Sequence, residues 1–184
     1  MTPERMTPEI LLEKLFNQKI LQEIVPINVE EICSHYNISI EHKFYSDDTV
    51  GQIEFPPNNG AARIFINPFE NSHINRRRFT IAHELGHFFL HKDSTPDGFT
   101  DTTRTMSRTA SYWDRVESEA NDFAARLLMP ENFILSEGNK VIEKFKKFYN
   151  QDLIPKDYFI SEMAQIFNVS VQAMTYRLKN LDII

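Results

Sequence analysis

The sequence predicts an α+β fold, in which a small and mainly antiparallel sheet is followed by helices. Two observations lead to this class. Segments with apolar residues at every second position, which are typical of strands, are confined to residues 38–66. Apolar residues at helical spacing dominate from residue 72 onward and also occur before residue 36. Strands grouped together, followed by helices grouped together, favour this class over a repeated strand–helix–strand unit.

The segment before the sheet is expected to contain two helices. Residues 8–24 have apolar side chains at helical spacing, with an interruption near Asn17. Asn28, with Glu31 three residues later, is typical of a helix N-terminus, because a short polar side chain accepts from a backbone N–H that has no partner in the helix. This signal predicts a short helix that continues through Tyr36.

Three strands are expected next. The apolar residues of segment 38–44 alternate, and residues 51–55 and 61–66 form two further strand-like segments. The connector 56–60 is rich in Pro, Asn and Gly, which suits a hairpin, and Pro68 ends the last strand. We expect residues 61–66 to be the sheet edge nearest the following helix, able to pair with an extended peptide; an ordinary core strand is the alternative.

Helices are expected over most of the remaining chain. The first two are separated by Lys92–Tyr112, a polar segment without a clear period, which is typical of a lid or binding segment and equally of a flexible insertion. Asn168 and Ser170 mark the turn and the N-cap between the last two helices. The expected helices cover residues 72–91, 113–129, 140–149, 158–167 and 171–181.

Composition limits the class of partner. The net charge of −6 at pH 7 and the isoelectric point of about 5.5 argue against a broad surface for nucleic acid. Cys33 is the single cysteine, so the chain can form neither an intramolecular disulfide nor a cysteine-rich metal cage. The sequence shows no secretory signal and no apolar run long enough to cross a bilayer. We therefore expect a cytoplasmic protein that does not contact membranes.

The stretch His83-Glu84-Leu85-Gly86-His87 carries the main chemical signal. Two histidines four residues apart on a helix lie one turn above each other on the same face, so both imidazoles can bind one metal ion. Glu84 can take a proton from a water molecule held at that ion, which is the reason for the H-E-x-x-H pattern. Gly86 costs about 0.5–1 kcal/mol relative to alanine inside a helix, so we expect another element to approach closely there.

His91 is not expected to be the third ligand. It lies four residues beyond His87 on the same helix, so a metal ion held between His83 and His87 would be about one turn, roughly 5–6 Å, away from it. We expect His91 to cap the helix end or to hydrogen-bond a ligand.

The segment 117–130 offers two carboxylates, Glu117 and Glu119, as the third ligand. They are about 200° apart around a helix, so only one can face the metal. Glu119 lies on a stripe of oppositely charged pairs, whereas Glu117 lies among small and apolar residues suited to close packing. A carboxylate on an apolar face is costly unless it is paired or bound to a metal, so Glu117 is the predicted ligand and Glu119 the alternative. Asn121, one turn on, is expected to hydrogen-bond a ligand.

Two motifs resemble the ImmA/IrrE family of metallopeptidases: RFTIAHELGH at residues 78–87 and ESEANDFAARLLMP at residues 117–130. Residues 66–68 and the terminal segment 169–181 are also similar to that family. The resemblance implies a zincin-like core, with a small sheet over an active-site helix and a second helix that supplies a glutamate ligand. It further implies a bacterial, phage or mobile-element protein that cleaves or otherwise inactivates a helix-turn-helix repressor, so that stress or element-transfer genes are switched on.

We therefore expect two parts in the chain, although no clear linker separates them. Residues 1–136 would form the zincin-like metallopeptidase core together with the N-terminal helices. Residues 137–184 would form a C-terminal helical segment of helix-turn-helix proportions, packed on the core. Its last helix has only Arg177 and Lys179 as cations, which favours packing or partner docking over DNA binding.

The predicted function is zinc-dependent hydrolysis of a peptide bond in a protein substrate, with one zinc ion per chain. A set of His83, His87 and one Glu favours zinc over manganese and leaves the fourth position for water. Glu84 is the predicted catalytic residue, and the second oxyanion donor is expected to be His91, Tyr112 or His73. The alternatives are a metal-containing regulator that sequesters a repressor without cleavage, and a DNA-binding regulator.

Overall fold

In the computed structural model, the described residues form seven helices and a four-stranded sheet, which is an α+β arrangement. The structure describes residues 6–56, 60–93, 95, 98–103 and 112–184, except for the side chains of residues 112–114. In chain order, the elements are α1 (Pro8–Asn17), α2 (Val29–His35), β1 (Ser39–His42), β2 (Thr49–Glu54), β3 (Arg63–Ile66), α3 (Ile74–His91), β4 (Phe99–Thr102), α4 (Tyr112–Leu128), α5 (Glu131–Tyr149), α6 (Lys156–Phe167) and α7 (Val171–Asn180).

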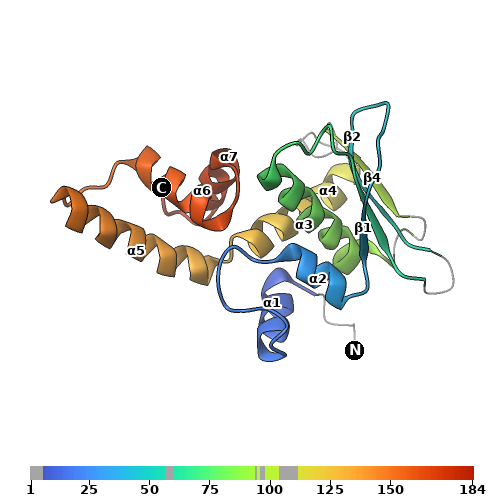
Figure 1. Ribbon diagram of the computed structural model, residues 1–184, viewed down its shortest axis with the longest axis horizontal. Helices are drawn as coiled ribbons and strands as arrows, with labels where there is room; N and C mark the ends of the chain where they lie inside the picture. The colour runs from blue at the N-terminus through green and yellow to red at the C-terminus, as the bar shows by residue number, and fades with distance from the viewer. Residues whose placement is uncertain (1–5, 57–59, 94, 96–97, 104–111) are drawn as a thin grey trace.

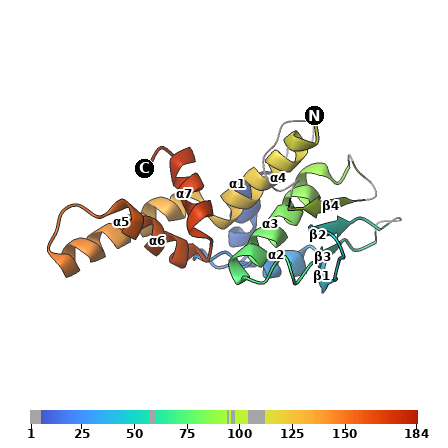
Figure 2. The same ribbon diagram turned by 90° about the horizontal axis from the view of Figure 1, so that it is seen from above.

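The molecule is elongated, with the sheet near one end (Figure 1). α3 lies against the sheet, where it contacts β2 and β3, and α4 packs along α3. α1 packs on α4, and α2 packs on α3 and β1. α5 extends away from the end of α4, and α6 and α7 fold back beside it, as the view from above also shows (Figure 2). The α3–α4 pair is therefore the centre of the fold.

The sheet is mixed, with the strand order β1-β3-β2-β4. β2 pairs antiparallel with both β3 and β4, so the sheet is mainly antiparallel, as predicted, and β1 pairs parallel with β3. The prediction that residues 61–66 form an edge strand is wrong, because β3 lies between β1 and β2. The consecutive burial of Ile64, Phe65 and Ile66 fits this central position. β1 and β4 are the edges of the described sheet.

The predicted helix signals are confirmed at three positions. Asn28 accepts a hydrogen bond from the backbone N–H of Glu31 at 3.2 Å, and Ser170 caps α7 through the N–H of Ala173 at 3.1 Å. Asn168 ends α6 in the left-handed conformation, with φ of 50°. These capping signals depend only on neighbouring residues, which is why the sequence was sufficient to predict them.

Two predicted helix boundaries are wrong. α1 ends at Asn17 and does not continue to residue 24, because the chain turns at Lys19, which has φ of 56°. α5 begins at Glu131, well before the predicted start at Lys140. It continues through Gly138, where the small residue makes room for the Phe159 ring of α6. α5 thus runs without a break across residues 136 and 137, and the division of the chain at that point stays a prediction.

The C-terminal helices are fastened to the rest of the chain by hydrogen bonds to backbone carbonyls. The buried Arg177 of α7 donates through Nε to the carbonyl of Met129 at 3.0 Å. Asn75 of α3 donates through Nδ2 to the carbonyl of Val169 at 3.1 Å. The latter carbonyl belongs to the turn between α6 and α7, so two hydrogen bonds tie this helix pair to earlier parts of the chain. Over the described residues, no helix has both the length and the apolar surface needed to span a membrane.

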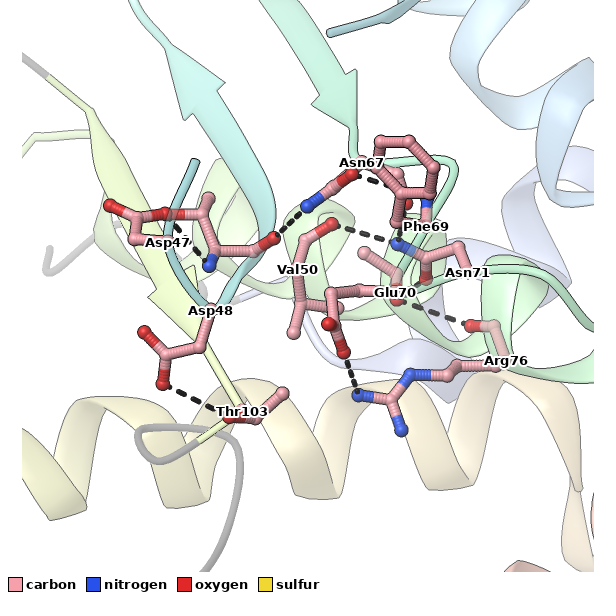
Figure 3. Close-up of polar contacts among 11 residues, drawn as sticks. Asp47, Asp48, Val50, Asn67, Phe69, Glu70, Asn71, Arg76 and Thr103 are labelled. Atoms are coloured by element: carbon pink, nitrogen blue, oxygen red, sulfur yellow. Dashed lines mark hydrogen bonds and ion pairs between the residues drawn. The ribbon is translucent and has the colours of Figure 1, made fainter. Parts of the chain in front are cut away.

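A network of carboxamides holds the start of α3 to the end of the sheet (Figure 3). Asn67 donates to the carbonyl of Thr49 at 2.7 Å, and Asn71 donates to the carbonyl of Val50 at 2.8 Å. The Oδ1 atom of Asn71 in turn accepts from the hydroxyl of Thr80, on α3, at 2.6 Å. All these side chains are buried, so the loss of one partner would leave polar groups unsatisfied. The network fixes how α3 enters the site described below.

Gly86 has the close neighbour that the sequence predicted. A Cβ atom at this position would lie 3.0 Å from Cα and 3.1 Å from the carbonyl oxygen of Ala120 on α4. These are backbone atoms of a packed helix, so α4 as a whole would have to shift to accept a side chain.

We expect Gly86→Ala to lower the free energy of unfolding by about 1–3 kcal/mol, because overpacking outweighs the gain in helix propensity. Denaturant titration at 25 °C measures this. Gly138→Ala is the matched control: its Cβ would meet side chains and no backbone, with Phe159 at 3.3 Å and the flexible end of Met163 at 3.9 Å. Equal stability of the two variants would contradict the close approach of α3 and α4.

Candidate metal centre

α3 presents the H-E-x-x-H motif to the interior. His83, Glu84 and His87 are all completely buried. The Nε2 atoms of His83 and His87 lie 3.0 Å apart, as expected for residues one helical turn apart on one face. Both imidazole nitrogens therefore point to a common place between α3, α4 and β4.

Two carboxylates complete the group. Glu117 of α4 places Oε2 at 3.2 Å from Nε2 of His83, and Oε1 at 3.5 Å from Nε2 of His87. Asp101 of β4 places Oδ2 at 3.3 Å and 3.5 Å from the same two nitrogens. One ligand atom from each of the four residues lies within 4.8 Å of the other three. Three separate elements thus supply donors to one buried point.

The donors fit a divalent cation. An ion with four bonds of about 2.0–2.1 Å in a tetrahedron holds its donors about 3.3–3.4 Å apart. The distances from the two histidines to the carboxylates, 3.2 to 3.5 Å, are close to that value. Oδ2 of Asp101 and Oε2 of Glu117 are buried, and among the described residues neither accepts a hydrogen bond. Buried carboxylate oxygens without donors are costly, and a cation would satisfy both.

Each histidine is oriented through its other nitrogen. Nδ1 of His83 lies 3.1 Å from Oδ1 of Asn121, which can only accept, so the predicted hydrogen bond between Asn121 and a candidate ligand is confirmed. Nδ1 of His87 lies 3.1 Å from Nδ1 of His91, and Nε2 of His91 lies 3.2 Å from Oε2 of Glu119. If a neutral His91 donates through Nε2 to Glu119, its Nδ1 accepts from the Nδ1–H of His87. Oδ1 of Asn121 likewise accepts from the Nδ1–H of His83, so both inner histidines carry their proton on Nδ1. Their Nε2 lone pairs then face the cluster, as metal binding requires.

The structure separates the two glutamates that the sequence offered as ligands. Glu117 faces the histidines, whereas Glu119 is bound by His91 and by Nε of Arg115 at 3.1 Å. His91 is buried next to His87 and hydrogen-bonds it, as one of its two predicted roles required. That Glu117 binds a metal stays a prediction, as do the roles of His83 and His87.

Asp101 was missed by the sequence analysis. It lies in β4, inside the segment that was predicted to have no regular structure, and that prediction is wrong for residues 99–102. The sequence signal for this strand was weak. Of the four residues 99–102, only Phe99 and Asp101 face inward, and one of these is polar. Four residues are too few to show a strand period. The ring of Phe99 from the same strand stacks on His87, with centroids 4.1 Å apart. β4 therefore both covers and completes the group.

Glu84 lies beside the cluster without a partner. Neither carboxylate oxygen has a hydrogen-bond partner among the described residues. The space for this side chain exists because residue 51 of β2 is glycine: a Cβ there would lie 2.4 Å from Oε1 of Glu84. Burial raises the pKa of Glu84 well above its usual range, the charge of Asp101 raises it further, and His83 opposes both. Glu84 is thus an unengaged carboxyl group whose charge depends on its neighbours.

The charges of His83 and Asp101 depend on each other. Burial alone would lower the pKa of His83, but the charge of Asp101 and the contact with Glu117 outweigh it and raise the pKa well above the usual value. Burial would raise the pKa of Asp101, but the charge of His83 holds it well below its usual range. A proton on His83 therefore balances the carboxylates when no cation does. Protons and a metal ion compete for the same lone pairs.

Two of the three expected oxyanion donors, His73 and His91, are not free to act at this point. His73 is exposed at the N-cap of α3, ten residues before His83 and therefore about 15 Å from it along the helix. Both ring nitrogens of His91 are engaged with His87 and Glu119. The side chain of Tyr112 lies outside the described ones.

A buried H-E-x-x-H helix with two added carboxylates is the arrangement of a metal-dependent hydrolase, and comparison with known sequences gives the same class. The sequence model of the family Peptidase_M78, described as the IrrE N-terminal-like domain, matches residues 33–179. The chain belongs to this ImmA/IrrE family of metallopeptidases.

Two curated relatives are similar to the chain. Metallopeptidase ImmA of Bacillus subtilis (strain 168) is 29% identical over 103 residues, which are 53% of this chain and 57% of that protein. The match thus spans little more than half the length of ImmA. Uncharacterized immunity region protein 2 of Bacillus phage phi105 is 29% identical over 133 residues, which are 71% of this chain and 76% of that protein.

We expect Glu117→Gln to lower the affinity for zinc by at least about tenfold, because a neutral carboxamide is a poor ligand for a buried cation. Glu119→Gln is the matched control on the same helix and should retain one zinc ion per chain. Metal analysis after dialysis against a zinc buffer measures both. Retention by Glu117→Gln together with loss by Glu119→Gln would show that the other carboxylate is the ligand.

Proposed function

We propose that the chain is a zinc-dependent endopeptidase with a zincin-like core, which hydrolyses a peptide bond within a protein substrate. The observation that supports this most directly is the Glu84 carboxyl, which has no hydrogen-bond partner among the described residues and lies beside four buried donors on three elements. A structural metal site would need the donors but not the adjacent free carboxyl. Nitrogen and carboxylate donors at tetrahedral spacing favour zinc over magnesium or calcium.

In this proposal, His83, His87 and Glu117 hold the ion. When bound, zinc supplies a Lewis acid that lowers the pKa of water towards about 7 and polarises a peptide carbonyl. Asn121 and the His91–Glu119 pair keep the two imidazoles in the required tautomer and orientation. Phe99 stacks on His87 and excludes solvent from that side.

Glu84 performs the proton transfers. It accepts one proton from the attacking water as the C–O bond forms at the substrate carbonyl carbon. It then gives that proton to the amide nitrogen as the C–N bond breaks, so the products are a carboxylic acid and an amine. Its position over Gly51, without a hydrogen bond from any described residue, leaves the carboxyl available for both steps. A nearby cation favours the ionised form that the first step needs.

For the substrate, we propose a helix-turn-helix transcriptional repressor, whose cleavage would derepress stress or mobile-element genes. Membership of the ImmA/IrrE family supports this class, and one relative is named as an immunity region protein of a phage. Such a repressor is met in the cytoplasm, which is the proposed place of action. We propose no direct contact with nucleic acid, because the net charge is −6.

We expect Glu84→Gln to keep its zinc and to reduce cleavage by about 10²–10⁴-fold, the usual size of a general-base effect. Sequencing of new protein N-termini in cells that express either form identifies cleavage and substrate together. Glu13→Gln, an exposed position on α1, is the control and should cleave as the wild type does. Cleavage by Glu84→Gln at the wild-type rate would overturn the mechanism. Repressor binding without any new N-terminus would support the regulator that only sequesters.

A further inference from the structure

The metal centre has one more donor than a catalytic zinc site commonly uses. Such sites take three protein ligands and leave one position for water or substrate, whereas sites with four protein ligands are closed. Asp101 lies as near to the two histidines as Glu117 does: 3.3 and 3.5 Å against 3.2 and 3.5 Å. By distance, Asp101 is an equal member of the set.

The position of Asp101 is built into the sheet. β4 pairs with β2 so that Asp101 lies opposite Gly51, and the side chain is 1% exposed. The residue after the strand, Thr103, is held by Asp48 twice: its N–H donates to the backbone carbonyl at 3.0 Å, and its hydroxyl donates to Oδ2 at 3.0 Å (Figure 3). The residue after the strand is therefore anchored to Asp48, and the carboxylate of Asp101 is directed inward.

We propose that Asp101 is a fourth protein ligand, which closes the metal site and keeps the folded chain latent. This inference rests on the metal site of the proposed function and adds a resting state to it. The carboxylate fills the place where water would enter, so Glu84 has no water to deprotonate until Asp101 withdraws. Catalysis then requires an exchange of ligands.

The four donors differ in how easily they can withdraw. His83 and His87 lie on α3, and Glu117 lies on α4, two helices packed at the close contact between Gly86 and Ala120. Asp101 lies on an edge strand of four residues with β2 as its one neighbour in the described sheet. The β2–β4 pairing also shifts register between Thr49 and Gly51. A short edge strand next to an irregularity opens at lower cost than a packed helix pair. Asp101 is thus the ligand that can leave.

The test measures whether the metal has an open position. The full chain is freed of metal, loaded with one equivalent of Co²⁺, and titrated with azide while the visible spectrum is recorded. With Asp101 bound, the wild type should show a four-coordinate Co²⁺ spectrum that azide leaves unchanged. Asp101→Ala should still bind Co²⁺, but azide should change its spectrum, with an affinity at least about tenfold higher than for the wild type. Its zinc affinity should fall by at least about tenfold, the lower end of the losses caused even by outer-shell changes.

Two further variants separate ligation from a disturbed strand. Asp101→Asn keeps the size of the side chain and should shift azide binding in the same direction. Asp48→Ala removes the acceptor of the Thr103 hydroxyl but no donor from the centre, and should behave as the wild type does. If Asp48→Ala admitted azide as readily as Asp101→Ala, the anchoring of β4, and not the carboxylate, would close the site, and the proposal would be overturned.

The outcomes distinguish this inference from the proposed function. A wild-type protein that binds Co²⁺ and takes azide as readily as Asp101→Ala has an open position, so the latent site is refuted and the peptidase proposal stands. A wild-type protein that binds no Co²⁺ has no metal centre, and both proposals fall. Should Asp101→Ala fail to fold, the wild-type titration alone decides. A change of the spectrum with azide overturns the closed site. A four-coordinate Co²⁺ spectrum that azide leaves unchanged supports the closed site.

Discussion

The burial of two histidines and three carboxyl groups in one small volume is the constraint on which the rest of the structure depends. Each buried ion costs several kcal/mol unless opposite charge and hydrogen bonds offset it. The set His83, Glu84, His87, Asp101 and Glu117 is nevertheless almost wholly removed from water. The fold meets this cost by collecting the groups around one point, where a cation can balance them. Gly86 of α3 lets α4, which carries Glu117, approach closely. Gly51 of β2 leaves room for the Glu84 side chain.

The surroundings of the donors serve orientation more than stability. Asn121, His91 and Glu119 fix the imidazoles from outside, and each comes from α3 or α4. At the other end of α3, Asn71 ties the helix to the sheet through Thr80 and the carbonyl of Val50. α3 is thus held at its start by the sheet and along its length by α4. A site that must place atoms within a few tenths of an ångström needs support of this kind.

The sequence was sufficient to predict those features of the site that depend on the geometry of a single helix. The pairing of His83 with His87, the choice of Glu117 over Glu119 as the inward carboxylate, and the contact of Asn121 all follow from helical periodicity, which is fixed at 3.6 residues per turn. The central place of β3 and the existence of β4 depend on which strands meet, and strand pairing joins residues far apart in the sequence. Asp101 was missed for this reason: it reaches His83 and His87 only because β4 pairs with β2, and the residues around it in the chain do not indicate that pairing.

The contact between Gly86 and Ala120 has an evolutionary consequence. Two of the three atoms nearest to a new Cβ at position 86 belong to the backbone of residue 120, and every amino acid has those atoms. A substitution at position 86 therefore has no compensating partner at position 120, since even glycine there would remove only the Cβ. At most core contacts, a larger side chain on one element can be offset by a smaller one on the other. This contact does not allow that, because position 86 meets backbone atoms. A side chain at position 86 is therefore expected to cost more than one at a core position whose neighbours are side chains, because no single substitution at position 120 relieves the contact.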